Sequence, residues 1–310
     1  MFYIGIDVGG TTSKGLAIDG QGNILAESAV DTVTGDGLAD CIDSLIEKLV
    51  ALAGAVFSDV AGVGVGCPGI IDSGSGTVVY AANLVLNDYP LGKLLKSKTG
   101  LNVKIVNDAN AAALGEARFG AGKGCKDSLF ITLGTGVGGG VVIDGKLFEG
   151  YKSAGAEIGH MVIARHGNKC TCGRRGCFEA YCSARALTKR TREAMEDDTA
   201  SEMWKTYTYF NCNGATAFEY MDTDATARKV VDWYLEHLAC GITNLCNIFR
   251  PQTVMLGGGV SAQGSRLTVP LQKMVDKEIF GGTDYAPVSV VCASLGARAG
   301  AFGAAALFMD

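Results

Sequence analysis

Three cysteines with metal-ligand spacing are the most specific chemical signal in the sequence. Cys170, Cys172 and Cys177 follow the pattern C-x-C-x4-C, and His160 lies shortly before them. Three thiolates and one imidazole form a closed tetrahedral set that holds structural Zn²⁺ and leaves no position for a catalytic water. A disulfide and chance clustering are the alternatives, and His166 competes with His160 as the nitrogen ligand.

Two glutamates flank this cysteine cluster. Glu157 precedes His160, and Glu179 follows Cys177. Folding of the segment around a metal would bring both carboxylates near one place, and carboxylates accept pairs of sugar hydroxyls well. The simpler interpretation is that both are surface acids, as most glutamates are.

Asn107-Asp108 joins a predicted strand to a predicted helix of sequence ANAAALGEARFG. Asp is a preferred N-cap residue, and this structural role alone would explain it. The functional interpretation is a general base that faces a substrate hydroxyl at the end of the strand. The positive end of the helix dipole is expected to lower the pKa of this carboxylate.

Glycine turns follow three of the predicted strands. Glycine lets backbone N–H groups approach an anion closely, and neighbouring threonines add hydroxyl donors, so the turns are interpreted as phosphate-binding rather than as ordinary hairpins. One turn also matches GxGxxG, but a strand follows it where a dinucleotide site needs a helix. The turns are Gly9–Gly10, Gly134–Gly139 and Gly257–Gly259, with Thr11, Thr12 and Thr135 beside the first two.

The hydrophobic pattern predicts the elements that carry these residues. Alternating or continuous apolar runs predict strands, and apolar residues at helical spacing predict helices. The segments DVGGTTSKGLAIDG and TLGTGVGGGVVIDG share one pattern, which predicts two related halves. The predicted strands cover 2–8, 13–18, 24–30, 60–66, 103–106, 128–133, 140–143 and 253–256, and the predicted helices cover 37–54, 183–197, 224–249 and 295–308. His237, in one of these helices, is expected to be solvated or satisfied locally.

Composition excludes several classes of protein. A hydrophobic content of 48% in 310 residues predicts a globular chain of two domains. The net charge of −5 and the absence of a basic stripe argue against nucleic-acid binding. Polar residues interrupt every apolar run, so neither a membrane segment nor a signal peptide is expected. Eleven cysteines, scattered except for one cluster, favour the reducing cytoplasm.

Taken together, these motifs resemble the ROK family (repressor, open reading frame, kinase), and within it the glucokinase-like sugar kinases. The resemblance covers nearly the whole chain, and its most specific part is the cysteine motif. The matching segments are DVGGTTSK at 7–14, CPG at 67–69, NDANAAALGE at 107–116, LGTGVGGG at 133–140, GAEIGH at 155–160, CTCGRRGCFE at 170–179 and LGGGVS at 256–261.

The resemblance implies an α/β fold of two actin-like, hexokinase-like (ribonuclease H-like) lobes around a cleft. It implies a smaller lobe of residues 1–117 plus 296–310, to which the final helix returns. It also implies a larger lobe of residues 118–295, which carries the zinc site and a homodimer interface.

The same resemblance implies a cytoplasmic enzyme of carbohydrate metabolism and glycolysis that uses ATP and Mg²⁺. Asp108 would take the proton from the 6-hydroxyl of a hexose. Asn83, Asn107, Asp108, Glu157, His160 and Glu179 would bind the sugar, and His160, Cys170, Cys172 and Cys177 would bind Zn²⁺. The implied nucleotide contacts are Gly9, Gly10, Thr11, Thr12, Lys14, Gly134, Thr135, Gly136, Gly257 and Gly258.

The identity of the sugar stays open. Glucose is the first choice, with N-acetylglucosamine, N-acetylmannosamine and fructose as alternatives, because the segment 79–90 lacks the tryptophan often found there in the family. A sugar-responsive repressor is a different class, but the first strand is expected from residue 2, which leaves no room for a DNA-binding helix-turn-helix. A non-catalytic sugar sensor would not need to keep Asp108 and all the glycine turns.

Overall fold

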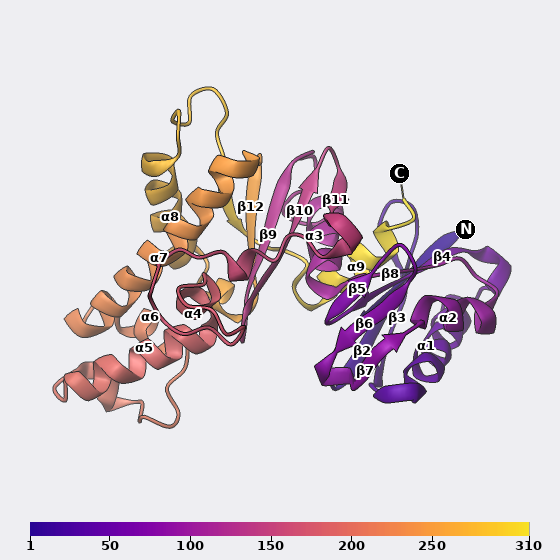
Figure 1. The fold of residues 1–310 in the computed structure, drawn as a ribbon, viewed down its shortest axis with the longest axis horizontal. Helices are drawn as coiled ribbons and strands as arrows, with labels where there is room; N and C mark the ends of the chain where they lie inside the picture. Colours follow the sequence, from indigo (N-terminus) through magenta and orange to yellow (C-terminus); the bar gives the residue numbers. More distant parts are fainter. Residues whose placement is uncertain (310) are drawn as a thin grey trace. The chain divides into compact units, whose positions relative to one another are not determined.

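The computed structural model describes residues 1–309 and divides into two compact units. The first unit comprises Met1–Phe130, Gly140–Ala156 and Ser294–Asp310, and the second comprises Ile131–Gly139 and Glu157–Ala293. Figure 1 shows the element order along the chain. The domain boundaries that the resemblance implies, near residues 117 and 296, stay predictions.

A five-stranded sheet forms the centre of the first unit. The strands lie in the order β3 (Ile24–Asp31), β2 (Thr12–Ile18), β1 (Phe2–Val8), β4 (Val60–Cys67) and β8 (Val103–Asn107). β1 pairs with β2 antiparallel and with β4 parallel, and β4 pairs with β8 parallel. The carboxyl ends of β1, β4 and β8 therefore meet at one edge of the sheet, where ligands bind in open α/β folds.

A second five-stranded sheet repeats this order. Its strands are β11 (Lys146–Phe148), β10 (Val137–Ile143), β9 (Ser128–Leu133), β12 (Thr253–Gly257) and β13 (Ser289–Cys292). β10 pairs antiparallel with β11, and β12 pairs parallel with β13, as their counterparts β2–β3 and β4–β8 do. The predicted duplication is thus confirmed strand by strand, and so is the mixed α/β class of the fold.

A small third sheet was not expected from the sequence. It orders β5 (Ile70–Asp72), β6 (Thr77–Ala81) and β7 (Leu86–Tyr89), all antiparallel. The strands are only three to five residues long, so no apolar periodicity could develop along them. This sheet positions the loop that carries Asn83.

The helices confirm the predicted spans to within a few residues. The first unit contains α1 (Leu38–Leu52), α2 (Leu91–Thr99), α3 (Asp108–Phe119) and α9 (Ala299–Ala306), and the second contains α4 (Glu179–Cys182), α5 (Ala184–Asp197), α6 (Thr216–Tyr220), α7 (Ala225–Phe249) and α8 (Ser265–Glu278). The last helix is shorter than the predicted 295–308, because a 3₁₀ turn at Gly296–Arg298 precedes it. None of the helices in residues 1–309 combines the length and apolarity that a membrane span requires.

A buried carboxylate fixes the far end of α3, the helix that begins at Asp108. Glu116 is fully buried, and its two oxygens accept hydrogen bonds from the backbone N–H groups of Ala121 (3.0 Å), Ser294 (3.0 Å) and Leu295 (2.7 Å). Three donors compensate for the loss of hydration that burial of a carboxylate causes. α3 is therefore tied to the segment that leads into α9.

α9 packs closely on the first sheet because β1 and β4 place glycines, Gly5 and Gly64, opposite the α9 backbone. All eight residues of α9 are buried, and the helix contacts β1, β4 and α3. A Cβ on Gly64 of β4 would lie 1.8 Å from the backbone oxygen of Ala304. Such an approach is possible only without a side chain at this position.

We therefore expect Gly64→Ala to lower the free energy of unfolding by about 2–3 kcal/mol, since a backbone atom cannot move aside as a side chain can. Urea denaturation would measure the change. Gly20→Ala serves as the matched control, because a methyl group there would meet no atom within 4 Å. Equal stability of the two variants would contradict the close packing of α9 on β4.

Candidate functional site

The sequence left two roles open for Asp108, N-cap of the helix and general base, and the structure gives the capping role to Asn107. Asn107 has extended backbone (φ −62°, ψ 145°) and is the N-cap of α3. Its Oδ1 accepts hydrogen bonds from the backbone N–H groups of Ala109 (2.9 Å) and Asn110 (3.2 Å). The capping role expected for Asp108 thus belongs to Asn107, and Asp108 is the first helical residue. Its carboxylate accepts from the backbone N–H of Ala109 (2.9 Å), and it keeps acceptor capacity for a substrate.

The pKa of Asp108 moves in the direction opposite to the one expected from the helix dipole. Burial at the end of β8 raises the pKa of this carboxyl, and the hydrogen bond from the Ala109 N–H opposes the shift only in part. Loss of hydration disfavours the charged form more strongly than the helix end favours it. A raised pKa makes Asp108 a stronger base than an exposed aspartate, which suits the removal of a hydroxyl proton.

A second acid, Asp7, shares this edge of the sheet and was missing from the predicted site. Asp7 lies near the end of β1 opposite Gly66 of β4, while Asn107 pairs with Cys67 of the same strand. Burial raises the pKa of Asp7 to about 6, the charge of Asp108 adds to the rise, and Lys14 opposes it. The sequence did carry a signal for Asp7, because a charged residue inside an apolar strand such as FYIGIDV is unusual unless it has a function.

A small pocket adjoins Asn107 on the side of the third sheet. It has a volume of about 240 Å³ and is lined by Pro68–Ile70 and by Tyr80–Asn83. The Asn107 side chain donates from Nδ2 to the backbone oxygen of Gly69 (3.2 Å). The first unit thus groups four candidate residues, namely Asp7, Asn83, Asn107 and Asp108, around one edge of its sheet.

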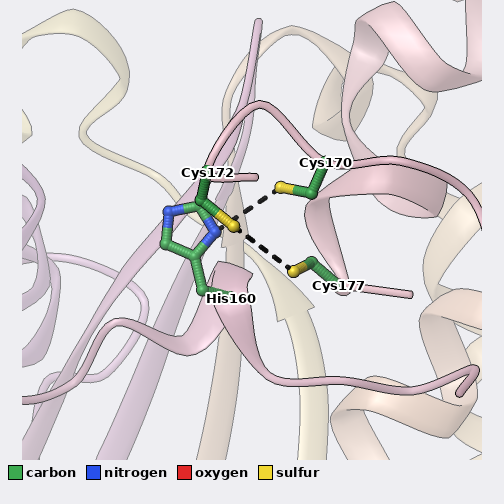
Figure 2. A group of neighbouring side chains, drawn as sticks. All are labelled: His160, Cys170, Cys172 and Cys177. Atoms are coloured by element: carbon green, nitrogen blue, oxygen red, sulfur yellow. Dashed lines mark hydrogen bonds between the residues drawn. The ribbon is translucent and has the colours of Figure 1, made fainter. Parts of the chain in front are cut away.

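The second unit brings the predicted metal ligands together. The ligand atoms of His160, Cys170, Cys172 and Cys177 all lie within 4.8 Å of one another. Figure 2 shows that Nδ1 of His160 points toward the three sulfurs, while its other ring nitrogen points away. His166 is not in this group, and all eleven cysteines are free thiols. His237 instead stacks on Tyr181 at 4.5 Å and lies 2.7 Å from the Trp233 carbonyl oxygen, so it is satisfied locally.

The spacing of the ligand atoms fits a tetrahedral metal. Sulfur and nitrogen ligands of tetrahedral Zn²⁺ are expected about 3.6–3.8 Å apart, given bonds of about 2.3 Å and 2.0 Å. The Cys172 and Cys177 sulfurs lie 3.7 Å apart, and the Cys170 sulfur lies 3.7 Å from His160 Nδ1. Burial raises the pKa of the Cys177 thiol to about 12. A divalent cation would supply the charge that this buried sulfur needs to ionise.

Glu179 connects the cysteine cluster to the glycine turn between β9 and β10. One carboxylate oxygen accepts from the Thr171 hydroxyl (2.9 Å), and the other accepts from the Val137 N–H (3.2 Å). A Cβ on Gly136 would lie 2.4 Å from this second oxygen, so a side chain there would displace the Glu179 carboxylate. Glu157, the residue before the 3₁₀ turn Ile158–His160, has an exposed side chain.

The glycine turns follow strands as predicted. Gly9 and Gly10 lie in the β1–β2 turn, and Thr12 and Lys14 lie on β2. Gly134–Gly136 join β9 to β10, which is a strand, so the GxGxxG match does not open a helix. Gly257 ends β12, and Gly258 precedes the 3₁₀ turn Gly259–Gln263. Thr11, Thr135 and Gly258 are exposed and can meet a ligand.

Known proteins resemble this chain over nearly its whole length. A glucokinase of Halalkalibacterium halodurans is 37% identical over 278 residues, which cover 88% of this chain and 84% of that protein. The crystal structure of a ROK family glucokinase from Streptomyces griseus, in complex with glucose and AMPPNP, is 35% identical, covers 99% of each chain and superposes with a TM-score of 0.78.

Repressors are also among the relatives. A putative xylose repressor of Caldicellulosiruptor sp. is 32% identical over 311 residues, which cover 99% of this chain and 78% of the repressor. The family model described as ROK matches residues 3–310. This chain therefore belongs to the ROK family.

Proposed function

We propose that this chain is an ATP-dependent sugar kinase that phosphorylates the 6-hydroxyl of a hexose, with glucose as the preferred substrate. The observation that carries the proposal is the state of Asp108: a partly buried carboxylate of raised pKa at the end of β8, relieved of helix capping by Asn107. The glucokinase names of the most similar relatives support the same reaction.

In the proposed reaction, the 6-hydroxyl oxygen attacks the γ-phosphorus of ATP, the bond to the β-phosphate oxygen breaks, and ADP leaves. Asp108 accepts the hydroxyl proton. Phosphoryl transfer depends mainly on positioning and charge neutralisation, so a carboxylate is a strong enough base. The backbone N–H groups of the glycine turns hold the phosphates, and Lys14 and the threonine hydroxyls add donors.

The proposed sugar contacts follow from the family resemblance. Asn83 and Asn107 of the first unit, and Glu157, His160 and Glu179 of the second, are assigned to the hexose hydroxyls by the family resemblance. Glu179 Oε1 accepts from the Thr171 hydroxyl and the Cys170 thiol, and Oε2 accepts from the Val137 N–H, so Oε2 retains acceptor capacity for a hydroxyl. His160 would bind Zn²⁺ through Nδ1, which leaves its other ring nitrogen for the sugar.

Two metals have different roles in the proposal. Zn²⁺ in the site of three cysteines and His160 would be structural, because four protein ligands leave no open position. Mg²⁺ would accompany ATP, and the charge of the metal would neutralise the β- and γ-phosphates. Asp7, beside Asp108, is the carboxylate that would help to hold this Mg²⁺.

The relatives also support a second candidate function, sugar-responsive repression, because xylose repressors align with 99% of this chain. A kinase and a sensor both bind sugar, but only the kinase turns over ATP. The eleven free thiols favour a reducing, cytoplasmic location. Assembly as a homodimer stays a prediction.

A sugar panel with coupled detection of ADP tests the proposal. Glucose, fructose, N-acetylglucosamine and N-acetylmannosamine would each be mixed with Mg-ATP and the protein. We expect glucose to give the highest kcat/KM, by about tenfold or more over the others. If ADP were released only with another hexose, that hexose would be the substrate in place of glucose. If no sugar caused the release of ADP, the sensor function would be favoured.

A further inference from the structure

A second and larger cavity in the first unit lies away from the candidate sugar site. It has a volume of about 890 Å³, within the range of small-molecule sites. It lies at the turn between β5 and β6, whereas Gly69 and Asn83 lie at the opposite end of this hairpin. Its walls are the turn Asp72–Gly76, the start of α2, residues 103–106 of β8, the segment 149–153 and Leu307.

Lysine side chains that form no ion pair with a carboxylate in residues 1–309 line this cavity. Four lysines line it, namely Lys93, Lys96, Lys104 and Lys152. None of the four forms an ion pair with a carboxylate in residues 1–309, although lysines elsewhere do, as Lys98 does with Asp40. Two acids also line the cavity, so the lysines leave an excess of two positive charges, in a protein whose net charge is −5. Such an excess in a concave site attracts anions.

The two acids are already engaged by neighbouring hydroxyl groups. Asp72 accepts a hydrogen bond from the Ser75 hydroxyl (2.9 Å), and Glu149 accepts one from the Ser73 hydroxyl (2.5 Å). These bonds hold the acids against the turn, and neither acid forms an ion pair with one of the four lysines of the cavity. The ammonium groups are therefore available to a ligand.

Backbone contacts hold the walls in place. The Gly92 N–H, in the first turn of α2, donates to the Gly76 oxygen (2.9 Å), and a Cβ on either glycine would lie 3.2–3.3 Å from the Cα of the other. The turn and the helix meet this closely because both residues are glycines. The positive end of the nine-residue α2 therefore borders the cavity.

One of the four lysines, Lys104, is held in position although it forms no ion pair. Lys104 Nζ donates to the Leu307 carbonyl oxygen (2.6 Å) and lies 4.7 Å from the centre of the Phe308 ring. Its remaining protons are free to bind an anion, and the loss of side-chain entropy on binding is already reduced.

We propose that this cavity is a binding site for a small phosphate-bearing anion, separate from the site of the proposed reaction. Lysine ammonium groups beside a helix N-terminus match the two negative charges of a phosphate monoester. The volume exceeds that of inorganic phosphate and accommodates a phosphorylated sugar, whose hydroxyls the remaining lone pairs of Asp72 and Glu149 would accept. The inference does not depend on the chain being a kinase.

Isothermal titration of the full chain with inorganic phosphate and with glucose 6-phosphate tests this site. Glucose and AMPPNP would be present at saturation, so that the candidate reaction site is filled. We expect Lys93→Ala/Lys96→Ala to weaken binding of the phosphorylated ligand by about tenfold or more. The charge-matched control is Lys48→Ala/Lys123→Ala, two exposed lysines that do not line the cavity, and it should change affinity less than about twofold.

The ligands distinguish the source of the phosphate. Tighter binding of glucose 6-phosphate would assign the cavity to phosphorylated sugars, and equal binding would assign it to phosphate itself. Equal weakening by both double variants would indicate an adventitious ion only and would overturn the proposal. So would the absence of binding up to about 10 mM of either ligand, while the reaction site remains filled.

Discussion

The Asp108→Asn variant is expected to lose at least about a thousandfold in kcat and to bind the hexose within about threefold of the unchanged protein. The amide keeps the size of the carboxylate and can still accept a hydrogen bond from the Ala109 N–H, but it cannot take up the hydroxyl proton. Steady-state release of ADP gives kcat, and titration calorimetry gives the affinity for the hexose.

Asp284→Asn is the matched control, because Asp284 is exposed on the second unit, far along the chain from the candidate residues. It should leave both quantities unchanged. Near-normal turnover of Asp108→Asn would remove Asp108 from the mechanism, whereas loss of hexose binding together with turnover would assign it a structural role.

Activity should also depend on pH through the same carboxylate. Burial raises the pKa of Asp108, so its basic form is complete above that raised pKa and is lost as the pH falls through it. The pKa of Asp7, about 6, acts in the same direction. We expect kcat/KM measured in the protein's folded range to fall about tenfold between pH 7.5 and pH 5. A flat profile over this range would contradict a carboxylate base with a raised pKa.

The Cys172→Ser variant is expected to lose its bound metal and then to bind the hexose at least about tenfold more weakly. Cys172 is exposed, so the exchange of sulfur for oxygen does not disturb a packed core. Without the metal, no ion would join the His160 ring to the three sulfurs, and the segment before Glu179 would depend on hydrogen bonds such as that from the Phe178 N–H to the Met161 oxygen (2.7 Å). Elemental analysis would measure zinc, and calorimetry would measure hexose affinity.

Cys125→Ser provides the control, because Cys125 is a partly buried thiol of the first unit, outside the metal group. It should retain both zinc and hexose affinity. Full hexose affinity in a zinc-free preparation of either variant would show that the metal does not position the sugar contacts.

Much of the fold could be predicted because periodicity records which faces of an element are buried. Ile4, Ile6 and Val8 of β1 are buried, and the repeated glycine turn with IDG marked the two related sheets. The third sheet was missed because three short strands bury too few residues to leave a pattern. The four side chains predicted as metal ligands do lie together, since they are close in sequence and their types are specific; the metal itself stays a prediction.

The finer assignments needed the structure because they depend on burial and on neighbours that are distant in sequence. The sequence does not reveal that Asn107, rather than Asp108, caps α3, nor that loss of hydration outweighs the helix dipole at Asp108. A charge inside the apolar strand FYIGIDV singles out Asp7, but only the parallel pairing of β1, β4 and β8 shows that it lies on the same edge as Asp108. The lysines of the second cavity come from three separate segments of the chain.

The most direct test of the central claim is the identity of the product. The protein would be incubated with glucose and Mg-ATP, and the mixture analysed by ³¹P and ¹³C NMR. The account predicts glucose 6-phosphate and ADP in equal amounts, and neither with Asp108→Asn. Formation of ADP with inorganic phosphate but no sugar phosphate, or phosphorylation at another hydroxyl, would contradict it.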